Sequence, residues 1–368
     1  MSKTIRAAIA RGADAPWTIE NVELGDPRED EILVRMVGVG ICHTDLACKA
    51  GQFPVPLPIV LGHEGAGVVE AVGSKVTTLK PGDHVVLSFD SCGHCRTCNK
   101  HNPAYCFEFF PRNFSGGRGS DGSRTIAQNG DPINSVFFSQ SSFATYAIAR
   151  EVNAVAIDKD LPLAIMGPLG CGIQTGAGAA VNSLAMSAGD SLAIFGAGGV
   201  GLSALLGARA IDAGAVIVVE PNERRASFAL ELGATHVINP KTTPDVLAKI
   251  RELVGGVNFA FDTTGIPAVV AVAVESLLPG GVLGMVGGPP PDAMLPANMM
   301  SMLARGISAK YIIEGDSDPK KFIPQMLAWY RAGKFPFDKM IKTFPFEQIN
   351  EAAHASEIGE VIKPVLTF

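Results

Sequence analysis

The stretch Ser191-Leu-Ala-Ile-Phe195-Gly196-Ala-Gly198-Gly199-Val-Gly201 decides the fold of the middle of the chain. A short apolar strand leads into the pattern G-x-G-x-x-G, and the Ala- and Leu-rich residues 202–212 that follow have helical spacing. Glycines at such a turn let backbone N–H groups approach a pyrophosphate closely, and the start of the helix favours its negative charge. The pattern therefore predicts a dinucleotide-binding loop with contacts at Gly196, Gly198, Gly199 and Gly201.

Further strands and helices alternate after this loop. Residues 216–220, 236–238, 259–261 and 282–286 are short, mainly apolar runs typical of strands, and residues 224–232 have helical spacing. Such alternation predicts βαβ units and a parallel sheet. Glu220 closes the second strand, where a carboxylate can accept hydrogen bonds from ribose hydroxyls and repel a 2′-phosphate. This favours NAD, although Arg224 or Arg225 could meet the extra phosphate of NADP.

The chain before residue 170 has a different character. Residues 31–37, 67–72 and 84–87 are β-type runs separated by Gly and Pro turns, which predict an antiparallel, barrel-like β domain. The polar, Gly-rich residues 107–140 predict a long surface loop. A helix over 319–332 and a closing strand over 365–368 should return to this first domain. The predicted class is therefore α/β, with a β-rich domain and a doubly wound parallel sheet.

Size and composition limit the function classes. A chain of 368 residues suggests two domains, and a hydrophobic fraction of 47% is enough for two cores. The net charge of −6, without a basic stripe, argues against a nucleic-acid partner. The most apolar stretch, residues 192–206, is interrupted by glycines and too short to span a bilayer, and the N-terminus shows no signal peptide. We expect a soluble, cytoplasmic protein with no membrane partner.

Four of the seven cysteines form a cluster within fifteen residues: Cys92, Cys95, Cys98 and Cys106. Four thiolates suit a closed tetrahedral zinc site, so this cluster predicts structural zinc. An iron–sulfur cluster is the alternative, but its run normally has a short final spacing and a following proline, and both are missing here. His94 and His101 lie inside the loop and are expected to be exposed.

A second set of metal-binding residue types is dispersed along the chain: Cys42, His63 and Cys171. Two sulfurs and one imidazole leave a fourth position open, which is the arrangement of a catalytic zinc. Taken singly, each residue could equally be a buried core residue. Cys48 is interpreted as a packing residue.

With these motifs, the chain resembles the zinc-dependent medium-chain alcohol dehydrogenases over nearly its whole length. The resemblance rests on residues 40–45, 62–65, the four-cysteine run, 170–172, the glycine loop and 366–368. Within the family the chain is most similar to bacterial aryl-alcohol (benzyl alcohol) and geraniol dehydrogenases, through residues 42–46 and 219–222. The resemblance implies a GroES-like catalytic domain over 1–172, to which 313–368 return, and a Rossmann NAD-binding domain over 173–312.

The resemblance also implies roles at the dispersed set. Its three residues would bind a catalytic Zn²⁺, which makes two Zn²⁺ per chain. Thr44 would receive the alcohol proton. Asp45 would hydrogen-bond the His63 ring and fix its tautomer, and Glu64 would approach the metal or exchange as a ligand. The implied contacts to NAD are, in order along the chain, His43, Thr175, Val200, Glu220, Arg225 and Lys363, of which His43 and Lys363 would meet the pyrophosphate and Val200 the nicotinamide.

One position departs from many relatives, which have a histidine five residues after the first zinc cysteine. Ala47 stands there, so the surface end of the proton relay must differ from that of these relatives. Phe53, Ser88 and Phe89 are candidates for the substrate pocket, with core packing as the alternative. Few charges lie in these segments, which favours an apolar primary alcohol of benzyl or allylic terpene type, such as geraniol, oxidised reversibly to its aldehyde.

Two other functions remain open at this point. A thiol-adduct or formaldehyde-type dehydrogenase would need an anion-binding pocket that the sequence does not reveal. A zinc- and NAD-binding protein without activity would not need Thr44. Relatives pair their Rossmann domains edge to edge, so a homodimer or homotetramer is expected, and the apolar run 296–313 could supply the interface.

Overall fold

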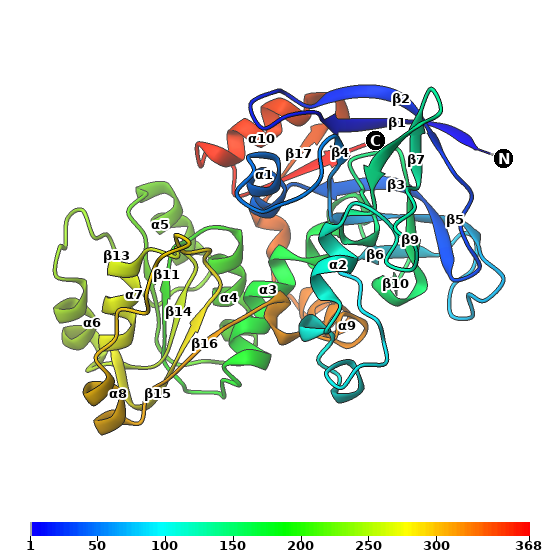
Figure 1. The fold of residues 1–368 in the computed structure, drawn as a ribbon. Helices are drawn as coiled ribbons and strands as arrows, with labels where there is room; N and C mark the ends of the chain where they lie inside the picture. Colours follow the sequence, from blue (N-terminus) through cyan, green and yellow to red (C-terminus); the bar gives the residue numbers. More distant parts are fainter. Residues whose placement is uncertain (1) are drawn as a thin grey trace. The chain divides into compact units, whose positions relative to one another are not determined.

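The computed structural model describes residues 2–368, and the chain divides into two compact units (Figure 1). Unit 1 comprises the chain up to Gly172 together with Asp318–Pro324 and Asp338–Phe368. Unit 2 comprises Ile173–Ser317 and Gln325–Phe337. Residues 313–317 and 325–337 thus pack with unit 2, although the sequence assigned 313–368 as a whole to the first domain.

Unit 2 contains a six-stranded sheet in which every strand pair is parallel. Its order across the sheet is β13-β12-β11-β14-β15-β16, the order 3-2-1-4-5-6 of doubly wound folds. The central strands are continuous apolar runs because both faces are covered. The strands are β11 (Leu192–Phe195), β12 (Val216–Val219), β13 (His236–Ile238), β14 (Val257–Asp262), β15 (Leu277–Met285) and β16 (Ser308–Tyr311).

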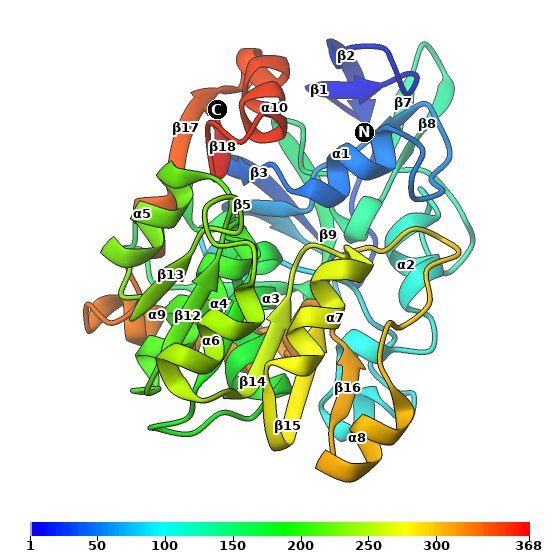
Figure 2. The ribbon, with the colours of Figure 1, turned by 90° about the vertical axis from the view of Figure 1, so that its left-hand side faces the viewer.

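Helices cover both faces of this sheet, with α6 and α7 on one side and α3 and α4 on the other (Figures 1 and 2). Three of them begin at side-chain caps, where Asn222 accepts from the first turn of α5, Asp245 from that of α6 and Asn298 from that of α8. The helices are α3 (Gly172–Gly178), α4 (Gly199–Ala210), α5 (Glu223–Glu231), α6 (Val246–Val254), α7 (Pro267–Glu275) and α8 (Met299–Arg305).

Unit 1 is built from β structure, as predicted. One set of strands closes a barrel in the order β1-β2-β7-β8-β4, and a second sheet has the order β10-β6-β5-β3-β18-β17, with β9 also paired to β3. The strands are β1 (Lys3–Ala10), β2 (Thr18–Leu24), β3 (Glu31–Gly40), β4 (Ile59–Val60), β5 (Glu64–Val72), β6 (His84–Leu87), β7 (Ile126–Gln128), β8 (Asp131–Ser135), β9 (Tyr146–Arg150), β10 (Ala154–Ile157), β17 (Ile341–Pro345) and β18 (Lys363–Thr367).

Short helices connect these strands. They are α1 (His43–Lys49), α2 (Phe109–Phe114) and α10 (Ile349–Glu357), and α9 (Pro319–Arg331) has residues in both units. The prediction of a long surface loop over 107–140 is wrong, because this segment contains α2, β7, β8 and the 3₁₀ turn η3 (Phe137–Ser139). Its phenylalanines explain the difference: Phe109, Phe137 and Phe138 are buried, and the polar and glycine content concealed them. Within residues 2–368, no helix has the length and apolar character needed to cross a membrane.

Candidate metal centres and cofactor loop

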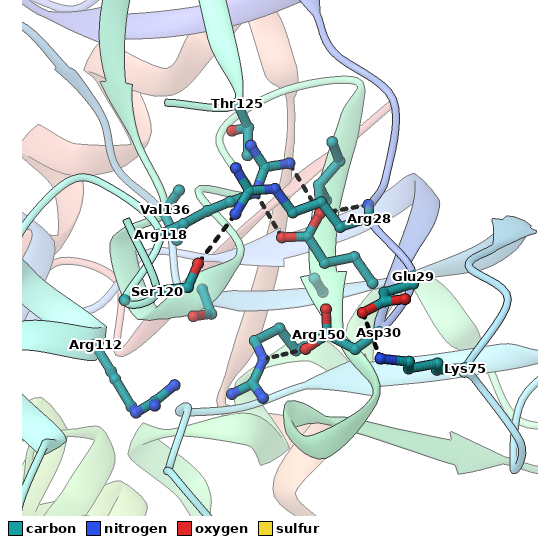
Figure 3. Close-up of a pocket in the computed structure, with 15 residues that line it drawn as sticks. Arg28, Glu29, Asp30, Lys75, Arg112, Arg118, Ser120, Thr125, Val136 and Arg150 are labelled. Atoms are coloured by element: carbon teal, nitrogen blue, oxygen red, sulfur yellow. Dashed lines mark hydrogen bonds and ion pairs between the residues drawn. The ribbon is translucent and has the colours of Figure 1, made fainter. Parts of the chain in front are cut away.

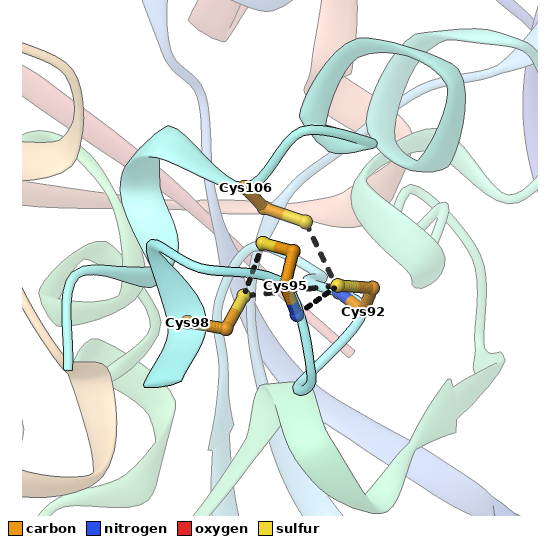
Figure 4. Close-up of side chains that lie close together, drawn as sticks. All are labelled: Cys92, Cys95, Cys98 and Cys106. Atoms are coloured by element: carbon orange, nitrogen blue, oxygen red, sulfur yellow. Dashed lines mark hydrogen bonds between the residues drawn. The ribbon is translucent and has the colours of Figure 1, made fainter. Parts of the chain in front are cut away.

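The four predicted cysteines converge between β6 and α2, with their sulfurs all within 4.8 Å of one another (Figure 4). The Sγ atoms of Cys95 and Cys98 are 3.5 Å apart and those of Cys92 and Cys98 are 3.9 Å apart. These separations are too long for disulfides and match the spacing of about 3.8 Å that four bonds of ~2.3 Å to one tetrahedral zinc would give. We call this cluster the four-cysteine centre. His94 and His101 are exposed, as expected.

Backbone groups also favour thiolates at this centre. The N–H of Cys92 donates to Cys106 Sγ at 3.2 Å, and the N–H of Cys95 donates to Cys92 Sγ at 3.3 Å. A hydrogen bond with the Thr97 side chain lowers the pKa of Cys95 to about 5, whereas burial raises the pKa of Cys106 to about 12. The residues present therefore fit a structural zinc.

The dispersed set also converges, and Glu64 joins it: ligand atoms of Cys42, His63, Glu64 and Cys171 all lie within 4.8 Å of one another, and all four residues are buried. Pairing of β3 with β5 places Gly40 opposite Glu64, which brings Cys42 beside the start of β5. Cys171 follows the turn η6 (Gly167–Gly170). We call Cys42, His63 and Cys171 the Cys–His centre.

The His63 imidazole tests whether this centre fits a metal. Its Nδ1 lies 2.9 Å from Asp45 Oδ1, while its Nε2 is buried with no hydrogen-bond partner among the described residues. A buried polar atom without a partner is costly, so Nε2 is placed for a ligand. With the proton on Nδ1, the free lone pair of Nε2 is the donor that zinc takes.

Asp45 organises the chain around this imidazole. It is fully buried, and besides His63 it accepts hydrogen bonds from the N–H of Gly62 at 3.0 Å and from the N–H of Cys42 at 3.0 Å. One carboxylate thus ties together the segments that carry two of the three candidate ligands. The geometry agrees with the tautomer-fixing role expected for Asp45.

The thiols of this region differ sharply. A hydrogen bond with Cys171, opposed by burial and assisted by the charge of Lys363, holds the pKa of Cys42 well below the usual thiol range, as a thiolate ligand requires. Burial raises the pKa of the Cys48 thiol, which agrees with its interpretation as a packing residue. Thr44 Oγ1 lies 3.8 Å from Cys42 Sγ, and His43 is exposed at the start of α1.

Lys363 forms an ion pair that the sequence did not suggest. It is buried in unit 1, with Nζ at 2.9 and 3.0 Å from the two carboxylate oxygens of Glu64 and at 3.3 Å from the Ile41 carbonyl, and its contact with a pyrophosphate stays a prediction. Burial acts to lower the pKa of Lys363, but the Glu64 charge outweighs it and raises that pKa. Burial raises the pKa of Glu64, and Lys363 opposes the rise. The ion pair was missed because its partners are 299 positions apart.

In unit 2, the predicted glycine loop joins β11 to α4, and Gly198 is the N-cap of that helix. Gly196 has φ = 99°, a conformation that disfavours side chains. A Cβ on Gly201 would overlap the carbonyl oxygen of Gly196, whereas a Cβ on Gly198 would meet open space. The loop is therefore tightly packed at Gly201 and open at Gly198, where a pyrophosphate needs room.

Glu220 faces this loop from the end of β12. Its Oε2 accepts from the N–H of Ala197 at 2.7 Å and its Oε1 from the N–H of Asn222 at 2.9 Å. Arg225, on α5, has a buried Nε with no hydrogen-bond partner among the described residues, so this donor is available to a ligand. Thr175 is buried on α3, and Val200 is half-buried in the first turn of α4.

The substrate-pocket candidates differ in their exposure. Phe53 is 43% exposed, Ser88 is buried with its hydroxyl donating to the Gly170 carbonyl at 2.6 Å, and Phe89 is buried against Phe109. Their role stays a prediction. The sequence missed Phe137 and Phe138, whose rings contact the His63 ring; the adjacent pair of phenylalanines in a polar segment was the available signal.

Comparisons with known proteins show the family of this chain. The family model for the GroES-like domain of alcohol dehydrogenases matches residues 28–159, and that for zinc-binding dehydrogenases matches residues 199–331. A geraniol dehydrogenase of Castellaniella defragrans is 56% identical over 364 residues, which cover 99% of this chain and 97% of that protein.

Two crystal structures are similar over the whole chain. A zinc-binding-domain alcohol dehydrogenase of Burkholderia ambifaria has a TM-score of 0.98 at 49% identity, with 100% of both chains covered. The benzyl alcohol dehydrogenase of Acinetobacter calcoaceticus has a TM-score of 0.96 at 46% identity, covering 100% of this chain and 99% of that one. The predicted family and fold class are confirmed. This chain belongs to the zinc-dependent medium-chain alcohol dehydrogenase family of oxidoreductases, with a GroES-like domain and a Rossmann domain.

Proposed function

We propose that this protein oxidises apolar primary alcohols, of benzyl or allylic terpene type, reversibly to aldehydes with NAD and zinc. The observation that carries the proposal is the buried Cys–His centre, with its thiolates and the unpartnered Nε2 of His63. The activities named for two similar proteins, on geraniol and on benzyl alcohol, support the substrate class.

Different residues of the chain have different roles in the proposed reaction. Cys42, His63 and Cys171 would hold zinc, which as a Lewis acid lowers the pKa of an alcohol. The Thr44 hydroxyl, 3.8 Å from Cys42 Sγ, relays the alcohol proton: Oγ1 accepts it and at the same time releases its own hydroxyl proton. Because Ala47 replaces the histidine of many relatives, the released proton passes to water. Hydride transfer itself is chemistry of the nicotinamide.

We also propose NAD as the preferred dinucleotide. The Glu220 carboxylate, held by two backbone N–H groups beside the glycine loop, repels a 2′-phosphate and accepts from ribose hydroxyls. Arg225 offers its unpartnered Nε to the adenosine side of the cofactor. His43 is a further candidate contact. Lys363, which is paired with Glu64, stays a candidate contact to the pyrophosphate.

The protein is proposed to be a cytoplasmic homodimer or homotetramer. β16 has one partner strand, β15, so its outer edge is open within the described part of unit 2. Beside it, α8 exposes Met299 (85%) and Leu303 (75%), which is unusual for apolar side chains of a monomer. A symmetric pairing of two β16 edges would cover both features.

The test is NADH production, followed by absorbance, with geraniol, benzyl alcohol and ethanol, and with NAD and NADP compared. We expect turnover with the first two alcohols and NAD, and a Cys171→Ser variant that has lost it. A protein that binds NAD and two Zn²⁺ but turns over no alcohol would favour the inactive binding protein. Turnover of thiol adducts of formaldehyde alone would favour a formaldehyde-type dehydrogenase.

A further inference from the structure

The His63 ring is held on three sides within unit 1. Asp45 fixes the Nδ1 edge by the hydrogen bond already described. The Phe138 ring stacks on one face, with centroids 4.4 Å apart and planes at 25°, and the Phe137 ring meets His63 edge-on at 5.3 Å. One hydrogen bond leaves an imidazole free to tilt about it, so the two phenylalanines set the plane of the ring and hence the direction of Nε2.

Both rings belong to residues 136–141, which we call the aromatic segment. Its backbone is strained, because four residues that are not glycine have positive φ: Val136 (143°), Phe138 (50°), Ser139 (51°) and Ser141 (46°). Such conformations persist only where the surroundings impose them, and they gather at functional sites. Ser141 imposes part of the conformation of the aromatic segment, since its Oγ accepts hydrogen bonds from the N–H groups of Val136 and Phe137, at 2.9 Å each.

Asp90 supplies a second anchor. Ser139 Oγ donates to its Oδ2 at 2.9 Å, and Arg150 Nη1 donates to its Oδ1 at 2.7 Å. Arg112 Nη1 lies 3.4 Å from Oδ2, and Asn113 bonds both the N–H and the carbonyl of Asp90. The carboxylate is buried, so these contacts form away from water and are stronger for it.

A cavity of about 470 Å³ lies against the aromatic segment, with Val136, Ser139, Arg112 and Arg150 in its wall (Figure 3). Packed side chains therefore do not support Ser139 from this side. The bond from its hydroxyl to Asp90 does so, together with the bond from Asn153 Nδ2 to its carbonyl at 3.3 Å. The other cations of the wall are already engaged with acidic residues, as Arg118 is with Glu31 and Lys75 with Glu29. The cavity thus does not offer free positive charge to an anion.

We propose that Asp90 is a positioning residue for the Cys–His centre: through Ser139 it holds the aromatic segment against His63 and so directs Nε2 at the metal. The inference rests on the proposed assignment of that centre. Asp90 also precedes Cys92 by two residues and is bonded to α2, which follows Cys106. Asp90 therefore lies between the segments that carry the two centres, with its backbone bonded to α2 and its carboxylate bonded to the aromatic segment.

The test replaces zinc by Co²⁺ in the full-length protein, because Co²⁺ reports its ligand geometry through visible absorption bands. In Asp90→Asn and in Ser139→Ala we expect the Co²⁺ affinity of the Cys–His centre to fall by about 10–100-fold, the usual effect of removing a residue that orients a ligand. Its absorption bands should shift, while those of the four-cysteine centre stay unchanged. The double variant should be no weaker than Asp90→Asn, since both changes break the same link.

Asp30→Asn is the matched control. Asp30 also lines the cavity and also binds Arg150, at 3.2 Å, but on the Nε of that guanidinium and without a bond to the aromatic segment. The same chemical change there should leave the Co²⁺ affinity of the Cys–His centre within about twofold of the unmodified protein, as expected for an exposed pair of little energetic weight.

Unaltered Co²⁺ affinity and spectrum in both Asp90→Asn and Ser139→Ala would overturn the proposal. Equal weakening of both centres, with a lower unfolding midpoint, would also overturn it, because Asp90 would then support only the fold. Failure of the proposed function looks different: an unmodified protein that holds a single Co²⁺ per chain removes the Cys–His assignment itself. If the unmodified protein holds two Co²⁺ and the variants bind Co²⁺ with unaltered affinity, only the proposed role of Asp90 is refuted.

Discussion

Replacing Asp45 by asparagine tests the Cys–His centre most directly. The carboxylate accepts three hydrogen bonds, from His63 and the N–H of Gly62 on Oδ1 and from the N–H of Cys42 on Oδ2. An amide has one oxygen, so its better orientation keeps the Oδ1 bonds and turns its NH₂ group towards the N–H of Cys42. That buried N–H is then unsatisfied, which costs about 1–3 kcal/mol.

The two remaining bonds weaken as well, because they lose an ionised acceptor, at about 1 kcal/mol each. Together the losses amount to about 4 kcal/mol. We therefore expect Asp45→Asn to lower the free energy of unfolding of the zinc-loaded protein by that amount and its zinc affinity by about 10–100-fold. Denaturant unfolding measures the first quantity, and chelator competition with metal analysis measures the second. Asp14→Asn, at an exposed position, is the control.

The loss of zinc affinity should be confined to the Cys–His centre. If Asp45→Asn keeps two tightly bound Zn²⁺ and the stability of the unmodified protein, the hydrogen-bond account of the Cys–His centre is refuted. If it loses both Zn²⁺ with equal ease, Asp45 supports unit 1 as a whole rather than this centre.

Two further predictions concern single carboxylates. Glu220→Gln keeps an acceptor for the N–H of Ala197 but removes the charge that repels a 2′-phosphate. The ratio of kcat/KM with NAD to kcat/KM with NADP should therefore fall roughly tenfold. An unchanged ratio would contradict the role of Glu220. Arg11 lowers the pKa of Glu20 from 4.5 to about 2. Because that pKa is depressed in the folded state, the pair stabilises above pH 4.5 and its contribution is lost as pH falls towards 2. Glu20→Gln should therefore lower the free energy of unfolding, measured with denaturant, by less than about 1 kcal/mol at pH 7 and by still less at pH 3.5. A loss of stability that increases as the pH falls would contradict the lowered pKa of Glu20.

The parts of the molecule that local sequence could predict are those made by neighbouring residues. Spacing alone specifies the glycine loop, the strands around it and the four-cysteine run, because each of them lies within a short stretch of sequence. The Cys–His centre needed the family resemblance, because its residues meet only through the pairing of β3 with β5 and the turn before Cys171. Resemblance did not locate the buried partner of Lys363 or the stacking of Phe138 on His63, which depend on side-chain packing.

The glycines beside the zinc cysteines show how packing and motif are connected. A Cβ on Gly40 would overlap Glu64 Oε2, and a Cβ on Gly172 would lie 3.0 Å from Glu64 Oε1 and 3.1 Å from Lys363 Nζ. The motif residues therefore make room for the buried ion pair. In a strand, Gly→Ala alone should stabilise by about 0.5–1 kcal/mol.

At Gly40 the sign should reverse. Gly40→Ala has to displace the Glu64 carboxylate, which leaves the Lys363 ammonium buried without its partner, a change that costs about 3–5 kcal/mol. Gly12→Ala, whose added Cβ would meet only Ala15 Cβ at 3.9 Å, should be close to neutral in the same denaturant assay. If Gly40→Ala were as stable as Gly12→Ala, Glu64 would be free to leave Lys363 at no cost, and the ion pair would not be what constrains this motif to glycine.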